Sequence, residues 1–156
     1  MKTAALFAAA AKVGACLGNK NKKEKDALES YGKNLGLAFQ IADDALDYFS
    51  TKTIFGKEIG KDFYEGKTTM PLIIIFQRAN NEERNFLKEI FKKKKRNEDD
   101  FSETLALINK YKVIQASFKR AEYFVNVSYD ALGIFHNSEE KRVLQNLTEF
   151  SLNRSF

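Results

Sequence analysis

Residues Leu35–Phe49 read LGLAFQIADDALDYF, and their spacing defines a helix with two different faces. At about 100° per residue, Gln40, Asp43, Asp44 and Asp47 fall on one narrow face of that helix. The residues on the opposite side are apolar: Leu35, Ala38, Ala42, Ala45, Leu46 and Phe49. This spacing predicts a helix that buries one apolar face and presents carboxylates on the other.

Three aspartates so close together on one helix face repel one another by roughly a few tenths of a kcal/mol per pair. Asp is also a poor residue for a helix interior. A bound cation would relieve the repulsion, and short carboxylates on a rigid helix suit Mg²⁺, whose shell is completed by water and phosphate oxygens. The pattern therefore predicts that Asp43, Asp44 and Asp47 hold Mg²⁺ beside a phosphorylated ligand. A solvated acidic patch is the alternative that the pattern leaves open.

The residues after this helix are rich in Gly and Lys. Gly56–Asp62 reads GKEIGKD, and Gly66–Thr68 reads GKT. Glycine lets the backbone approach a ligand closely, and a lysine ammonium group binds phosphate as a point charge. The glycine spacing of a P-loop is not met. We expect metal on one side of a diphosphate and ammonium groups on the other.

The rest of the chain is also predicted to be helical, because a single Pro in 156 residues suits long helices rather than a loop-rich β-sandwich. The expected helices are Lys2–Leu17, Lys25–Ser50, Thr68–Ala79, Glu82–Lys94, Phe101–Asn109, Lys112–Phe135 and Asn137–Asn153, the last with Ser138 as its N-cap. On composition alone Leu72–Phe76 suits a buried strand, but its helical neighbours favour a helix. The predicted fold class is all-α, in one domain over residues 1–156.

The charge balance permits anionic partners without demanding nucleic acid. Lys and Arg number 26 against 21 Asp and Glu, which gives a net charge of +5. The longest basic run, Lys92–Arg96, is followed at once by acidic residues and has no interleaved aromatic residues that would stack on bases. We interpret the run as a solvated turn between helices, with a membrane-surface or nucleic-acid patch as the alternative.

Single residues exclude several kinds of site. With only Cys16 and His136, one chain cannot form a disulfide framework, a cysteine zinc site or a His-pair metal site, so any metal is a hard cation bound by oxygen. Both residues are interpreted as structural.

The apolar segment Thr3–Gly18 is too short to span a bilayer and is interrupted by Lys12, so we expect a buried helix in a cytoplasmic protein rather than a signal peptide.

Five segments resemble the C-terminal half of the trans-prenyltransferases, the polyprenyl diphosphate synthase family, in its long-chain type. Phe39–Asp47, FQIADDALD, is similar to the second aspartate-rich motif of that family. Lys2–Phe7 resembles the Lys-Thr motif on the preceding helix, and the segments Gly56–Asp62 and Glu65–Leu72 resemble the loop and helix start that follow the aspartates. The tail Leu147–Arg154 is similar to the final helix of long-chain members.

The resemblance implies a role for each matching residue. Metal ligands would be Asp43, Asp44 and Asp47, and the diphosphate would be bound by Lys2, Lys57 and Lys67. The residues acting at the reacting centre would be Lys2, Thr3, Gln40 and Lys57. The implied cofactor is Mg²⁺, and the implied substrates are an allylic prenyl diphosphate and isopentenyl diphosphate.

The same resemblance implies a partial isoprenoid-synthase-type bundle around a central cavity, without its N-terminal helices. The first aspartate-rich motif of the family does not occur in these 156 residues. We therefore expect exposed apolar surface on the first helices, inactivity alone, and a homodimer or a complex with an N-terminal half, with peripheral membrane contact through the product. The alternatives are a non-catalytic subunit paired with a full-length synthase and a generic helical interaction domain.

Overall fold

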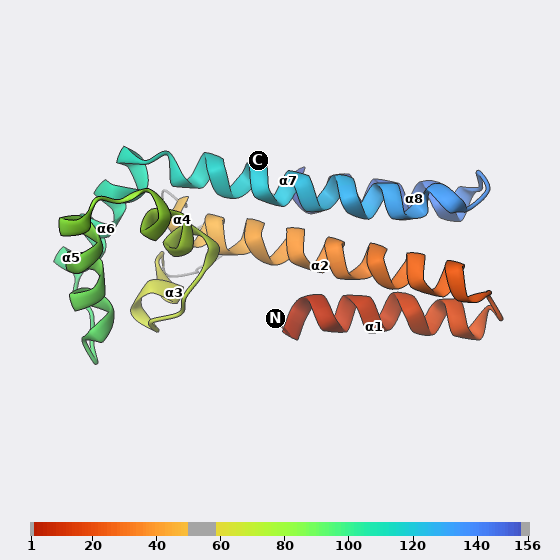
Figure 1. The fold of residues 1–156 in the computed structure, drawn as a ribbon, viewed down its shortest axis with the longest axis horizontal. Coiled ribbons are helices and arrows are strands. Elements are labelled where there is room, and N and C mark those ends of the chain that lie inside the picture. The colour runs from red at the N-terminus through yellow and green to blue at the C-terminus, as the bar shows by residue number, and fades with distance from the viewer. Residues whose placement is uncertain (1, 50–58, 154–156) are drawn as a thin grey trace. The chain divides into compact units, whose positions relative to one another are not determined.

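The computed structural model describes residues 2–49 and 59–153, and every regular element in these ranges is a helix (Figure 1). The elements are α1 (Lys2–Leu17), α2 (Lys22–Phe49), α3 (Lys61–Tyr64), α4 (Met70–Arg78), α5 (Asn81–Lys92), α6 (Glu98–Lys110), α7 (Val113–Ala131), the 3₁₀ helix η1 (Leu132–Ile134) and α8 (Glu139–Asn153). The predicted all-α class is confirmed, and Leu72–Phe76 lies inside α4 rather than in a strand.

The chain folds as two compact units, which are described separately. The first unit comprises the described residues of 2–42 and 119–153, and the second comprises those of 43–118. Helices α2 and α7 each contribute residues to both units.

In the first unit, α1 packs closely against α2 because glycines line the contact. A Cβ atom at Gly36 would lie 2.7 Å from the Cα atom of Ala4, and one at Gly32 would collide with the carbonyl oxygen of Phe7. A side chain of any size at Gly36 would therefore push the helices apart. The rings of Phe7 and Phe39 meet across the same contact, with 5.7 Å between their centroids.

Helices α7 and α8 are held to α2 through Tyr31. The Tyr31 hydroxyl donates to the carbonyl oxygen of Leu144 at 2.9 Å, and the buried Ser128 hydroxyl donates to the carbonyl oxygen of Tyr31, also at 2.9 Å. Ser138 caps α8 as predicted, because its hydroxyl accepts the backbone N–H of Lys141 at 3.2 Å.

The second unit has its own apolar core. Its fully buried residues include Phe63, Leu72, Ile75, Leu87, Ile90, Ile108 and Val113. Capping boxes start two of its helices: the side chain of Asn80 accepts the N–H of Glu83 at the start of α5, and that of Asn97 accepts the N–H of Asp100 at the start of α6.

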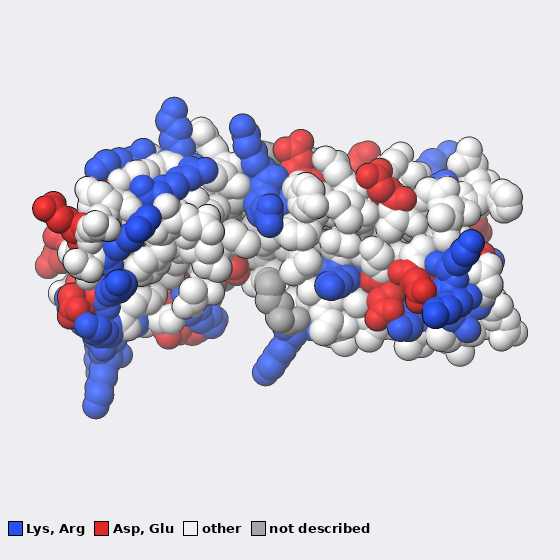
Figure 2. Space-filling view, in the orientation of Figure 1, with Lys and Arg blue, Asp and Glu red and all other residues white. Residues whose placement is uncertain are grey.

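Two expectations about side-chain burial need correction. Phe49, which the helical pattern places on the apolar face of α2, is 52% exposed at the end of that helix. Arg96, which we interpreted as part of a solvated basic turn, is half-buried, whereas Lys92–Lys95 are exposed. On the face shown in Figure 2, Lys and Arg side chains form a row over the second unit, with Asp and Glu at its edge, and the two signs are mixed over the first unit.

The expectation of a buried helix over Thr3–Gly18 is wrong, because only Ala4, Ala8 and Ala15 of α1 are buried. Apolar side chains remain exposed on α1, as expected for a bundle without the N-terminal helices of the family. Leu6, Val13 and Leu17 are exposed by 71%, 55% and 81%. Among the described residues, no helix combines the length and the hydropathy that crossing a membrane requires.

Candidate functional site

The first unit brings together two of the predicted site residues, Thr3 and Gln40. The Thr3 hydroxyl donates to Oε1 of Gln40 at 2.8 Å, although 37 positions separate them in the chain. The close approach of α1 at Gly36 makes this contact possible, since Gly36 lies one helical turn before Gln40 and meets the first turns of α1. Lys2, at the start of α1, is exposed.

The second unit contains the aspartates, and two of them are almost completely buried. Asp44 is 7% exposed and Asp47 is 5% exposed, so neither lies on a solvated patch. The N–H of Met70 donates to Oδ2 of Asp44 at 3.3 Å, and the N–H of Asp62 donates to Oδ2 of Asp47 at 2.9 Å. These carboxylates therefore bind the first turns of α4 and α3 to the end of α2, and the negative charge suits both helix N-termini.

Asp47 holds the start of α3 through its backbone as well. Its carbonyl oxygen accepts the N–H of Gly60 at 2.9 Å. Gly60 has φ 75°, a left-handed conformation that favours glycine. The role of Asp44 and Asp47 as acceptors for this segment was missed in the sequence, because a helical pattern places side chains on a face without showing what packs there.

Buried hydroxyl groups lie near the carboxylates. The hydroxyls of Tyr48 and Thr69 are buried and have no hydrogen bond of acceptable geometry among the described residues. Burial raises the pKa of Tyr48, and the nearby charge of Asp47 adds to this effect. The phenol therefore stays protonated, although the neighbouring Thr69 hydroxyl acts in the opposite direction and lowers this pKa.

The donor atoms fit a hard cation, although the side chains do not form a ready cage. Within residues 2–49 and 59–153, no three His, Cys, Asp or Glu side chains converge as a metal-binding group would. Mg²⁺ is usually held by one or two carboxylates, with water and substrate phosphates completing six oxygen ligands. Asp43, Asp44 and Asp47 supply oxygen donors of this kind, and Asp43 is the more accessible of the three.

Lys67 lies on the turn that the aspartates anchor. Its Nζ atom is 2.8 Å from Oδ1 of Asp62 and 2.7 Å from Oε2 of Glu65, and its side chain is 54% exposed. The hydrogen bonds from Lys67 to Asp62 and then Glu65 raise the pKa of the lysine, so it carries a full positive charge. Asp62 and Glu65 belong to the segments quoted above, but no role was predicted for either. Lys57, the other lysine predicted in this loop, lies outside the described residues.

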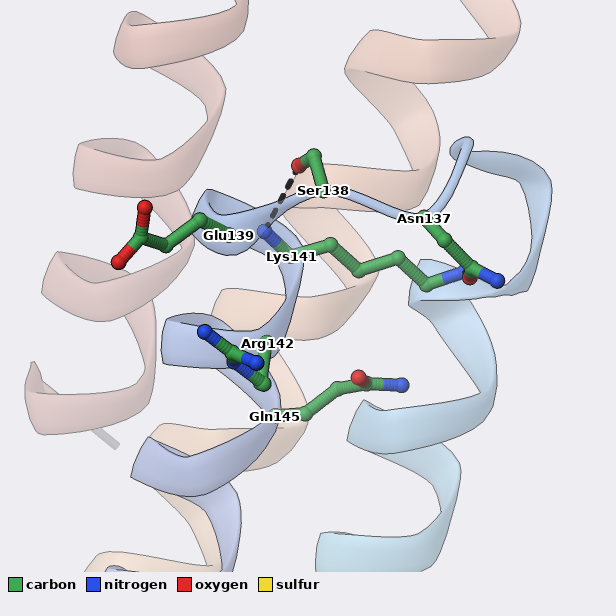
Figure 3. Close-up of a pocket in the computed structure, with 6 residues that line it drawn as sticks. All are labelled: Asn137, Ser138, Glu139, Lys141, Arg142 and Gln145. Carbon is green, nitrogen blue, oxygen red and sulfur yellow. Dashed lines mark hydrogen bonds between the residues drawn. The ribbon is translucent and has the colours of Figure 1, made fainter.

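A pocket of about 370 Å³ opens beside the start of α8, in the first unit (Figure 3). Its lining residues are Asn137, Ser138, Glu139, Lys141, Arg142 and Gln145. None of the predicted site residues lines it. The Lys141 ammonium group is already engaged there, donating to the carbonyl oxygen of Phe135 at 2.8 Å.

Comparison with known proteins gives a consistent result. Residues 1–108 match the family described as Polyprenyl synthetase. The chain is 32% identical over 155 residues to an octaprenyl diphosphate synthase of Haemophilus influenzae, covering 99% of this chain and 47% of the relative. It is 35% identical over 153 residues to a short chain isoprenyl diphosphate synthase of Methanothermobacter thermautotrophicus, covering 98% and 46%.

Solved structures agree. A polyprenyl synthase of Caulobacter crescentus, complexed with calcium and isoprenyl diphosphate, superposes with a TM-score of 0.88 at 36% identity, covering 99% of this chain and 47% of that one. A decaprenyl diphosphate synthase of Rhodobacter capsulatus gives 0.85 at 34% identity, with coverage of 99% and 47%. The chain thus spans about half the length of the relatives it matches.

Proposed function

Because the chain belongs to the polyprenyl synthetase family, we propose that it supplies the C-terminal half of a site that elongates allylic prenyl diphosphates with isopentenyl diphosphate. The observation that carries this proposal is the link between the acidic helix and the lysine turn. Asp47 binds the backbone of Asp62, and the Asp62 carboxylate binds Lys67. These two hydrogen bonds connect carboxylates that suit a cation with an ammonium group that suits a phosphate.

The proposed roles follow from the chemistry of each group. Asp43, with Asp44 and Asp47, would hold Mg²⁺, which when bound neutralises charge on the diphosphate. Lys67 would bind diphosphate oxygens, as would Lys2 and Lys57 from their own segments. Since Lys67 is paired with Asp62 and Glu65, a diphosphate has to share the ammonium group with these carboxylates or displace them.

The reaction breaks the bond between the allylic carbon and the diphosphate oxygen, and the electron pair leaves with the diphosphate. The double bond of isopentenyl diphosphate then supplies the electrons for the new carbon–carbon bond, and a proton is lost. The fixed charges stabilise the leaving group most strongly as its negative charge develops. The Gln40 amide oxygen, oriented by the Thr3 hydroxyl, is a dipole suited to the electron-poor carbon.

We further propose that the chain acts together with an N-terminal half that carries the first aspartate-rich motif, or as a homodimer. The match to about half of each relative and the exposed Leu6, Val13 and Leu17 on α1 support a need for further covering surface. The second candidate function is that of a non-catalytic subunit that pairs with a full-length synthase. The same exposed side chains of α1 would then form the contact with that synthase.

Reconstitution distinguishes the two candidates. The chain would be mixed with a separately produced N-terminal half of the Haemophilus influenzae relative, and prenyl transfer would be followed with labelled isopentenyl diphosphate. We expect Mg²⁺-dependent transfer that Asp43→Ala abolishes, while Asp99→Ala, a matched change at an exposed aspartate of α6, leaves it intact. Transfer that survives Asp43→Ala would favour the non-catalytic subunit instead.

A further inference from the structure

Arg96 ends the basic run Lys92–Arg96, and its guanidinium group is held against the second unit's aromatic side chains. The Cζ atom lies 4.7 Å from the centre of the Phe91 ring and 5.9 Å from that of Phe63. Nη2 donates to the carbonyl oxygen of Phe91 at 3.0 Å. A planar guanidinium stacked on rings and bonded through its fork is fixed in position, unlike a solvated lysine.

The other arm of the fork reaches the end of α3. Nη1 of Arg96 donates to the carbonyl oxygen of Tyr64 at 3.3 Å, across 32 positions of the chain. The last carbonyl groups of a helix lack partners inside the helix. Arg96 therefore satisfies one of the carbonyl groups with which α3 ends.

The turn that follows α3 provides hydrogen-bond donors for two more of the last carbonyl groups of this helix. The N–H of Gly66 donates to the carbonyl oxygen of Phe63, and that of Lys67 donates to the carbonyl oxygen of Asp62, both at 2.9 Å. With Gly66 at φ 74°, this pair of bonds is a Schellman motif. Lys67 is the first residue after that left-handed glycine, so the motif sets the direction in which its side chain leaves the turn.

Arg96 also lies directly against the glycine. A Cβ atom at Gly66 would be 2.9 Å from both Nη1 and Nη2 of Arg96. The guanidinium thus occupies the space that a side chain at Gly66 would need, so only glycine fits at this turn position beside Arg96. The turn is thus anchored to Asp47 where α3 begins and to Arg96 where α3 ends.

We propose that Arg96 is a positioning residue for Lys67, because it fixes the turn from which Lys67 binds a diphosphate. The inference rests on the proposed role of Lys67. Arg96 donates to the backbone carbonyl oxygens of Tyr64 and Phe91, and the proposal gives it no contact with the diphosphate, so its removal should weaken diphosphate binding only through Lys67.

Two measurements on the 156-residue chain test this proposal. Amide hydrogen exchange read by NMR reports the Lys67 N–H, and calorimetry reports the affinity for inorganic pyrophosphate in the presence of Mg²⁺. In Arg96→Ala we expect exchange at Lys67 about 10-fold faster, since the turn loses a partner. We also expect a dissociation constant for pyrophosphate about 5–10-fold higher than that of the wild-type chain. When Lys67 has already been replaced by Ala, the added Arg96→Ala substitution should weaken pyrophosphate binding little further.

Arg84→Ala is the matched control. Arg84 is also half-buried in the second unit and also donates to a carbonyl oxygen, that of Gln77 at 3.1 Å. Its loss should lower global stability to a similar extent without changing exchange at Lys67 or the affinity for pyrophosphate. If Arg84→Ala and Arg96→Ala act alike on both readouts, Arg96 has only a general structural role and the proposal is wrong.

Arg96→Lys keeps the experiment decisive should Arg96→Ala fail to fold. Lysine keeps a cation near Phe91 but cannot bond both carbonyl groups at once, so exchange at Lys67 should rise about 3-fold. Unchanged exchange in folded Arg96 variants overturns the proposal, as does faster exchange with unchanged pyrophosphate affinity. Absence of pyrophosphate binding in the wild-type chain contradicts the proposed function instead, while the exchange rates still decide whether Arg96 holds the turn.

Discussion

Replacing Gly36 by Ala tests whether the close contact of α1 with α2 is what brings Thr3 to Gln40. The new Cβ atom would lie 2.7 Å from Cα of Ala4 and 3.1 Å from Cβ of Phe7, so α1 would have to move. Overpacking of this kind costs about 1–3 kcal/mol. The higher helix propensity of Ala offsets about 1 kcal/mol of that, which leaves a net loss of up to about 2 kcal/mol.

The assay is urea unfolding followed by far-UV circular dichroism, with Gly14→Ala as the control. Gly14 lies inside α1, and a Cβ atom there would meet nothing within 4 Å, so this substitution should stabilise the chain by about 1 kcal/mol. The difference between the two variants then isolates the steric cost. If Gly36→Ala stabilises the chain as much as Gly14→Ala does, the tight contact and its role in positioning Thr3 are refuted.

Substitutions at three further residues test other contacts. The pKa of Glu83 is lowered to about 2, mainly by its hydrogen bond from Lys110. A Glu in the unfolded chain has a pKa of about 4.3. The ionised Glu83 therefore stabilises the folded state above about pH 4.3, and this stabilisation is lost as the pH falls towards 2. Glu83→Gln should therefore flatten the loss of stability across this range in an acid titration, and an unchanged slope would contradict the assignment. Asp47→Ala leaves the N–H of Asp62 without its acceptor and should cost about 1–3 kcal/mol in thermal unfolding, whereas Asp47→Asn, which retains an acceptor oxygen, should cost less; equal losses would mean that the hydrogen bond is unimportant. Tyr31→Phe removes the donor to a carbonyl oxygen of α8 and should cost about 1 kcal/mol in urea unfolding, and wild-type stability would exclude that bond as a tie to α8.

Local sequence patterns were sufficient where a helix depends on its own residues. The Ala-rich run predicted Lys2–Leu17, and α1 has these bounds. The apolar run Leu72–Phe76 was correctly assigned to a helix rather than a strand on account of its helical neighbours, and Pro71 lies in the first turn of that helix, where proline is tolerated.

The remaining features depend on contacts between distant residues. Helix α3 has four residues, too few to show a helical period, and it is held by Asp47 and Arg96 from other parts of the chain. Arg96 was grouped with its lysine neighbours because a basic run looks alike whether it is solvated or stacked on Phe91. The sequence places the aspartates and the lysines close along the chain, but it does not show that Asp47 accepts a hydrogen bond from the backbone of Asp62, in the segment that leads to Lys67.

The most direct test of the account is the thermal stability of the chain with Mg²⁺ and an allylic diphosphate, added separately and together. If the face of α2 that carries Asp43 binds a metal–diphosphate complex, both ligands at about 100 times their dissociation constant should stabilise the fold by about 2.7 kcal/mol. Either one alone should have much less effect, and Asp43→Ala should remove the gain. A melting temperature that is the same with and without the combined ligands would contradict the account and favour a helical interaction domain.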